Sequence, residues 1–156
     1  MAPGERVPDP PSPVFCLTDI PPNVAGTTHL MALIQDSDKH IVLLLLADQA
    51  VHEPHPLLIH FTSATRPFLS CVRPAVLCRA YRMGGLRTPN WATKDIMFLA
   101  TETNLAEKKY GLNGKDEVGV IVIRPDGYVA FSSRVSGNGN GLVEMSLFLS
   151  ELFIRA

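Results

Sequence analysis

The sequence predicts an α/β domain in which helices flank a mixed β-sheet. Two strand-like segments joined through a helical segment imply a parallel pair of strands, because such a crossover is the usual connection between parallel neighbours. Further along the chain, two β-rich segments flank Pro125-Asp126-Gly127, which is turn chemistry and indicates an antiparallel hairpin. A helical stripe of apolar residues then ends the chain.

The parallel unit is predicted from three successive segments. Ile41–Ala47 is an apolar run between polar residues, as expected for a strand that is buried on both faces. Residues 55–72 are apolar at nearly helical spacing, and Pro67 should kink or end that helix. Residues 75–81 follow Pro74 and are predicted to form the second strand.

The second half of the chain completes the predicted fold. The predicted elements are an extended segment at residues 96–100, a short helix at 105–110, the hairpin at 118–131 and a final helix at 142–154. The resulting order, strand, helix, strand, helix, hairpin and helix, is the thioredoxin-like arrangement. We therefore predict a thioredoxin-like α/β fold with a central mixed sheet, a C-terminal β-hairpin and flanking helices.

We expect a single domain with a proline-rich beginning. Five prolines among the first fourteen residues exclude a helix or a central strand there. Residues 1–40 are thus predicted to be a lead-in and a first segment that pack on the domain, and residues 41–156 to be its thioredoxin-like core.

Composition excludes several classes of protein. The chain has 156 residues, of which 46% are hydrophobic and 19% charged, so we expect a folded protein with a sizeable core. A net charge of −1 argues against a nucleic-acid binder, which needs a clustered basic surface. No apolar run approaches the roughly 20 residues that cross a bilayer, and no secretory signal opens the chain. We expect a cytoplasmic protein without a membrane partner.

The cysteines give little support to disulfide or metal chemistry. Cys16, Cys71 and Cys78 are odd in number and form no C-x-x-C pair. This spacing argues against a disulfide scaffold, a structural zinc site and a dithiol redox centre. We expect buried or partly buried free thiols. A single nucleophilic cysteine is the alternative.

Candidate catalytic residues follow the first parallel strand. They are Asp48, His52, Glu53 and His55. In open α/β sheets ligands gather at the carboxyl ends of the strands, and thioredoxins carry their reactive cysteines there. Histidine beside a carboxylate supplies acid and base groups near neutral pH, so we predict catalytic roles. A solvated polar loop is the simpler alternative, and the short spacing matches no reliable metal-binding pattern.

Candidate substrate-binding residues follow the second strand. They are Tyr81, Arg82, Arg87 and Trp91. Arginine and tryptophan both stack on flat ring systems, so these side chains are predicted to bind an aromatic substrate. Packing or surface roles are the alternative.

Two further motifs are more simply structural. Gly137–Gly141 lies between a strand and a helix, but its glycine spacing matches no phosphate-binding pattern, which favours a flexible loop. Arg124–Gly127 is expected to form the turn of the hairpin.

Residues 120–129, with the sequence VIVIRPDGYV, carry a family resemblance. They resemble the VRPDGYV segment near the end of FAD-dependent aromatic hydroxylases of the phenol 2-monooxygenase type. Residues 4–9 resemble the GxRxP entry segment of the same C-terminal domain, although that family often has His where Asp9 stands. Residues 109–112 resemble its Tyr-Gly turn. The resemblance covers nearly the whole chain but only the last domain of those enzymes. It implies a thioredoxin-like fold that lacks redox cysteines and helps to hold dimers together.

The flavin chemistry of those hydroxylases is not implied for this chain. No G-x-G-x-x-G follows an N-terminal strand, and the FAD and substrate domains have no counterpart in the sequence. We therefore predict no cofactor and no metal. The resemblance implies a free-standing relative of the kind found in fungal pathways for aromatic polyketides.

Two functions compete at this point. The first is a cofactor-independent enzyme that uses acid and base groups for intramolecular cyclisation or isomerisation of a phenolic substrate. The second is a non-catalytic dimerisation or interaction module. A retained dithiol reductase activity ranks third, because the C-x-x-C pair is missing. Either of the first two is compatible with a homodimer, which the very apolar final helix favours.

Overall fold

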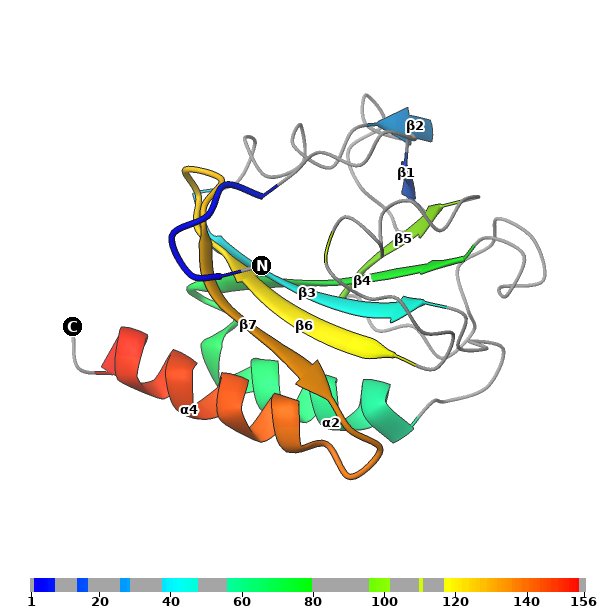
Figure 1. Cartoon of the computed structure of the whole chain (residues 1–156). Helices are drawn as coiled ribbons and strands as arrows, with labels where there is room; N and C mark the ends of the chain where they lie inside the picture. Colours follow the sequence, from blue (N-terminus) through cyan, green and yellow to red (C-terminus); the bar gives the residue numbers. More distant parts are fainter. Residues whose placement is uncertain are drawn as a thin grey trace.

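A seven-stranded mixed sheet forms the centre of the part of the chain that the computed structural model describes, with the strand order β2-β1-β5-β4-β3-β6-β7 (Figure 1). The described residues are 2–7, 14–16, 26–28, 38–47, 56–79, 96–101, 110 and 117–154. The strands are β1 (Val14–Cys16), β2 (Gly26–Thr28), β3 (His40–Ala47), β4 (Val72–Arg79), β5 (Met97–Thr101), β6 (Val118–Ile123) and β7 (Val129–Val135). The helices are α2 (Pro56–Thr65), the short 3-10 helix η1 (Arg66–Phe68) and α4 (Asn140–Ile154).

The sheet combines a parallel centre with antiparallel additions. Strands β3, β4 and β5 run parallel, and α2 connects β3 to β4. Strand β6 is antiparallel to β3, and β7 is antiparallel to β6. The predicted parallel pair, terminal hairpin and final helix are thereby confirmed.

Strand β3 separates two apolar layers. The even-numbered side chains Val42, Leu44 and Leu46 face α2 and α4, which lie side by side on one face of the sheet (Figure 1). The odd-numbered Ile41, Leu43 and Leu45 face the opposite layer. All six are exposed by 1% or less, as expected for a strand covered on both faces.

The opposite layer includes residues from the chain's beginning. Val7 is buried there, and its N–H donates to the carbonyl of Gly127 at 2.9 Å. Gly4 N–H donates to Val129 O, and Val129 N–H donates to Glu5 O, both at 2.8 Å. The segment thus pairs with the start of β7, while β1 and β2 add two strands to one end of the sheet.

Strand β4 begins earlier than predicted. It starts at Val72, so Pro74 lies inside the strand instead of preceding it. Strand β5 joins β4 only from Ala75 onward, opposite Met97. At Pro74, β4 therefore has a partner strand on one side only, where a residue without an N–H is tolerated.

The other boundaries differ from the sequence expectation by a few residues. Helix α2 ends at Thr65, and Pro67 lies in η1, so the proline does end the regular helix. Strand β7 continues to Val135. Of the short helix predicted at 105–110, only Tyr110 is among the described residues, where it is buried.

Gly141, which the sequence predicts in a flexible loop, is the second residue of α4 and brings two backbones into close contact. A Cβ added at Gly141 would lie 2.3 Å from the carbonyl oxygen of Arg134 in β7. A Cβ at Gly137 would meet nothing within 4 Å. Gly141 is therefore required by the packing of α4 on β7.

The substitution Gly141→Ala should destabilise the fold by roughly 2–3 kcal/mol, a typical cost of forcing atoms into a packed region. The usual gain of about 1 kcal/mol for Ala over Gly in a helix is too small to offset this clash. Gly137→Ala is the matched control and should change stability by less than about 1 kcal/mol. Urea denaturation measures both; equal stability of the two variants would contradict the close contact.

Candidate functional site

The eight residues predicted as a site lie outside the described residues. Asp48, His52, Glu53 and His55 follow the end of β3, and Tyr81, Arg82, Arg87 and Trp91 follow the end of β4. The strand register pairs Ala47 with Cys78, so β3 and β4 end at the same edge of the sheet. The roles given to the eight residues stay predictions.

The sequence places no cysteine at the carboxyl end of β3. Residues 47–56 read ADQAVHEPHP, so the position where thioredoxins carry reactive cysteines holds none. Any thiol chemistry of this chain must therefore use Cys16, Cys71 or Cys78.

The backbone keeps the three cysteines apart. Cys71 directly precedes β4 and Cys78 is near the end of that strand, and seven residues of strand span about 23 Å. Cys16 in β1 is opposite Leu99 in β5, which in turn lies between β1 and β4. Two strand spacings separate Cys16 from β4, about 10 Å, whereas a disulfide needs Cα atoms within about 7 Å. No pair of these cysteines can form a disulfide within this sheet.

Cys71 and Cys78 have different surroundings. Cys78 is fully buried, and its thiol donates to the carbonyl of Leu99 at 3.4 Å. Cys71 is a free, half-buried thiol in the turn between η1 and β4. Its Sγ lies 3.5 Å from the hydroxyl of the exposed Ser70. Solvent access makes Cys71 the more reactive of the two by position.

Two backbone hydrogen bonds hold Cys71 in place. Its N–H donates to Phe68 O at 2.8 Å, and its carbonyl accepts from the N–H of His40 at 3.2 Å. The second bond joins residues 31 positions apart, because β3 and β4 begin at the same edge. No sequence motif links His40 to Cys71, so His40 was not among the predicted site residues.

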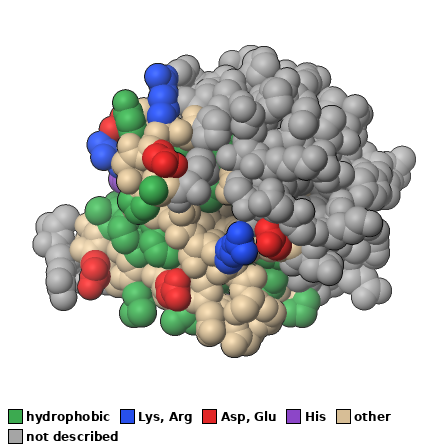
Figure 2. All heavy atoms as spheres, in the orientation of Figure 1, with side chains coloured by type: hydrophobic (Ala, Val, Ile, Leu, Met, Phe, Trp, Pro, Cys, Tyr) green, Lys and Arg blue, Asp and Glu red, His purple; other side chains and the backbone are tan. Residues whose placement is uncertain are grey.

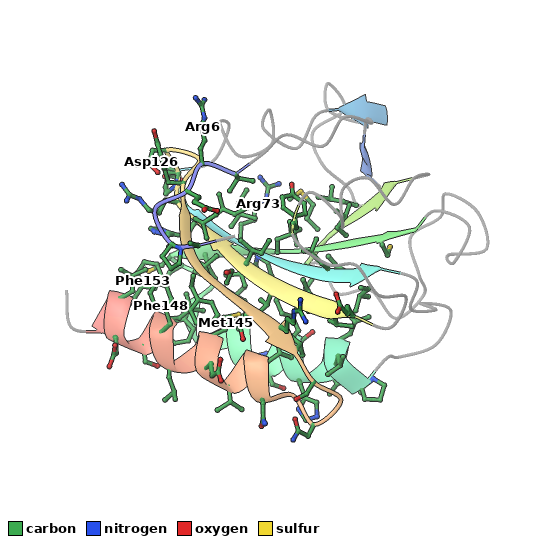
Figure 3. All side chains as sticks on the ribbon, viewed as in Figure 1. Arg6, Arg73, Asp126, Met145, Phe148 and Phe153 are labelled. Atoms are coloured by element: carbon green, nitrogen blue, oxygen red, sulfur yellow. The ribbon has the colours of Figure 1, made fainter. Side chains whose placement is uncertain are left out.

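His40 packs against the end of α4. Its ring meets that of Phe153 edge-on, with centroids 5.2 Å apart, and Phe153 also lies 6.4 Å from Phe68. Figure 3 shows Phe153 on the side of α4 that faces the sheet. Burial lowers the pKa of His40, the Arg124 charge lowers it further, and the Asp126 charge partly raises it.

Arg124 and Asp126 act first as turn residues. Arg124 Nη2 donates to Asp126 Oδ2 at 2.5 Å, and the other carboxylate oxygen accepts from Tyr128 N–H at 3.4 Å. Gly127 has φ +86°, a left-handed conformation that glycine adopts without strain. The expected turn role is thus supported, and these charges also form the electrostatic surroundings of His40.

The described residues form neither a metal-binding cluster nor a membrane-spanning helix. There, no three His, Cys, Asp or Glu side chains come together in a way that could hold a metal ion. No helix in the same part of the chain is long and apolar enough to span a bilayer.

Comparison with solved structures shows the fold. Mycobacterium tuberculosis AhpC is 13% identical, with a TM-score of 0.67 over 97% of this chain and 93% of that protein. The mitochondrial 2-Cys peroxiredoxin from Plasmodium falciparum is 13% identical, with a TM-score of 0.65 over 99% and 96%. The thioredoxin domain of a thiol-disulfide oxidoreductase from Bacteroides vulgatus is 10% identical, with a TM-score of 0.56 over 96% and 98%.

The comparisons by sequence identify no family for this chain. No protein-family model matches the chain, and no curated protein is similar to it in sequence. At 10–14% identity the structural matches establish the fold, so the predicted thioredoxin-like α/β class is confirmed.

The predicted function is corrected by these neighbours. They are peroxiredoxins and thiol-disulfide oxidoreductases, which contradicts a cyclase or isomerase of polyketide biosynthesis and gives no better support to a non-catalytic module. A relationship to the C-terminal domain of phenol hydroxylases is not shown either. An enzymatic role remains compatible with neighbours such as thioredoxin peroxidase I from Plasmodium yoelii.

The substitution Arg124→Gln should raise the pKa of His40. It removes a positive charge that disfavours the protonated ring, while the Asp126 carboxylate that favours it remains. An NMR titration of the His40 ring measures the shift. Arg134→Gln is the control, because Arg134 pairs with Glu117 at 3.4 Å in a different part of the hairpin. An unchanged His40 pKa in Arg124→Gln would rule out this coupling.

Stability should depend on pH through His40. Because its folded-state pKa lies below the unfolded value of about 6.5, the unfolded chain takes up the proton first as the pH falls. The contribution of the neutral His40 ring to stability is complete above the unfolded-state pKa. It is lost as the pH falls toward the folded-state pKa. Thermal unfolding should therefore show a smaller loss of stability on acidification for His40→Gln than for the wild type. Parallel pH profiles of the two proteins would exclude His40 as a source of the loss.

Proposed function

We propose that the protein is a thiol-redox enzyme that acts through one cysteine, Cys71, by thiol–disulfide exchange with small disulfides. The observation that carries this proposal is the contrast between the half-buried Cys71 and the fully buried Cys78, in a sheet that keeps all three cysteines apart. The redox names of the structural neighbours support the reaction class.

The exchange needs one thiol of the protein and one small disulfide. The Cys71 thiolate attacks one sulfur of the disulfide, and a bond between that sulfur and Cys71 Sγ forms as the original S–S bond breaks. The departing half leaves as a thiolate and takes up the proton that Cys71 has lost. A second small thiolate then attacks the bound sulfur, which restores Cys71 and completes a new small disulfide.

The turn at Cys71 suits an external partner. Two backbone hydrogen bonds fix its position, and the neighbouring Ser70 is exposed, so a small molecule can approach Sγ from solvent. Since no second cysteine lies within disulfide reach in the sheet, the mixed disulfide must be resolved by a thiol from outside the chain.

The proposed function includes a location of the protein in the cell. A thiol of this kind is kept reduced in the cytosol, where glutathione and thioredoxin maintain reducing conditions. We therefore retain the cytoplasmic location that the sequence predicts as part of the proposed function.

The reduced protein, incubated with oxidised glutathione, should gain one glutathione on Cys71, detected by intact mass and peptide mapping. Cys71→Ser should lose this adduct. Cys78→Ser is the matched control, because serine keeps a donor for the Leu99 carbonyl, and Cys16→Ser tests the third thiol. An adduct that persists in Cys71→Ser would contradict the assignment of the site.

A second experiment tests catalysis by comparing the reaction rate of the folded protein with that of a short peptide. The folded protein should react with oxidised glutathione at least about tenfold faster than a short peptide that contains residues 66–76, because exchange rates depend on the surroundings of the attacking thiol. Equal rates would mean that Cys71 is an ordinary accessible thiol, and the enzymatic proposal would be abandoned.

A further inference from the structure

Cationic residues flank the turn that carries Cys71. Arg66 begins the 3-10 helix η1 that leads into this turn, and Arg73 follows Cys71 in β4. A third cation, Lys39, directly precedes β3, and it reaches the turn because β3 and β4 begin at the same edge of the sheet. The fold therefore adds a positive charge to the two that the sequence places beside the thiol.

A hydrogen bond across the edge of the sheet fixes the ammonium group of Lys39. Lys39 is half-buried, and its Nζ donates to the carbonyl of Leu69, 30 positions along the chain, at 3.1 Å. Leu69 precedes Cys71 by two residues in the same turn. Since consecutive Cα atoms are about 3.8 Å apart, the ammonium charge lies on the order of 10 Å from Cys71 Sγ. Charges interact over this distance at ordinary ionic strength, where the Debye length is about 10 Å.

The two arginines differ from Lys39 in how they reach the thiol. Arg66 is exposed and Arg73 is half-buried, and neither forms an ion pair with another residue in the described part of the chain. Both belong to the same short segment as Cys71, so they accompany the thiol even in a peptide. Only the charge of Lys39 depends on the folded sheet, and its effect can therefore be measured separately.

The carboxylates at this end of the sheet leave an excess of positive charge. Asp38 is exposed beside the start of β3, and Glu151 is exposed near the end of α4. Glu151 follows the fully buried Leu149 by two residues, so it points away from the sheet. Arg124 and Asp126 pair at the hairpin turn and nearly cancel. Figure 2 shows Lys and Arg beside Asp and Glu side chains at the upper left, the end at which β3 begins in Figure 1.

We propose that Lys39 makes Cys71 select small disulfides that carry carboxylate groups. This inference rests on the proposed function and names its substrate class. The exchange itself is unchanged: the Cys71 thiolate attacks one sulfur, the S–S bond breaks, and the departing thiolate takes up the proton. Lys39 forms no bond in this step and is a positioning residue, because its charge attracts an anionic disulfide to the thiol and repels a cationic one.

Coulomb's law gives the size of the expected effect. In water, two unit charges about 10 Å apart change a rate constant roughly twofold. The charge of Lys39 raises the rate for an anionic disulfide and lowers it for a cationic one. Removing that charge should therefore lower the ratio of the two rate constants about fourfold at low ionic strength. Salt at about 1 M should abolish most of this selectivity, because the Debye length falls to about 3 Å.

Rates of adduct formation on Cys71 of the reduced full chain test the proposal. The probes are oxidised mercaptopropionate, which is anionic, cystamine, which is cationic, and oxidised mercaptoethanol, which is neutral; peptide mapping by mass spectrometry follows each adduct. Lys39→Gln should lower the anionic-to-cationic ratio about fourfold, and Lys39→Arg should retain it. Arg134→Gln is the matched control, because it removes the same charge at the opposite edge, where Arg134 pairs with Gly119 and Gly119 with Leu45.

The peptide of residues 66–76 provides a second comparison. It contains both arginines of the turn but not Lys39. The folded wild type should therefore show a higher anionic-to-cationic ratio than the peptide. A change in the intrinsic reactivity of the thiol alters both rates alike and cancels in this ratio.

Two results would overturn the role of Lys39. One is an unchanged ratio in Lys39→Gln, and the other is an equal fall in Arg134→Gln, which would be an effect of net charge alone. The proposed function fails in a different way, if the folded chain reacts with the neutral disulfide no faster than the peptide does. The neutral probe and the ratio thus distinguish the two failures, and circular dichroism checks that every variant is folded.

Discussion

The burial of β3 on both faces is the constraint on which the rest of the structure depends. Its side chains from Ile41 to Leu46 alternate between two apolar layers, and its backbone pairs with β4 on one side and β6 on the other. Burying one such side chain contributes about 1.5–3 kcal/mol, so this strand alone contributes as much as the net stability of a typical domain, about 5–15 kcal/mol. A shift of one residue would exchange the two layers, which fixes the register.

That register decides which residues can meet at each edge of the sheet. The carboxyl ends of β3 and β4 lie together, as do their amino ends, where His40 is next to Cys71. Thioredoxins place reactive cysteines at the carboxyl edge. In this chain the more accessible thiol of Cys71 and Cys78 is that of Cys71, at the amino edge, with no second cysteine within disulfide reach. The same fold therefore supports a different, single-thiol chemistry in our proposal.

The two glycine-containing motifs of the second half of the chain have structural explanations. Gly141 allows α4 to approach the backbone of β7, and Gly127 provides the left-handed conformation that the hairpin turn requires. The resemblance to aromatic hydroxylases depended largely on this Arg-Pro-Asp-Gly turn. A turn motif reports how the backbone reverses, and it carries no information about a reaction, so the function inferred from it was wrong.

The sequence by itself determined β3, α2, β4, β5, the hairpin and α4 in that order, because apolar periodicity and turn chemistry act over a few neighbouring residues; it did not predict β1 and β2. Ile41–Ala47, the hairpin and the final helix were predictable for that reason, and so was the thioredoxin-like class. The predicted site residues lie outside the described part of the chain and remain predictions. Only the tertiary structure decided that Pro74 lies within a strand, that the lead-in pairs with β7, and that Cys71 lies next to His40. These features depend on strand register, which is set by packing between residues far apart in the chain.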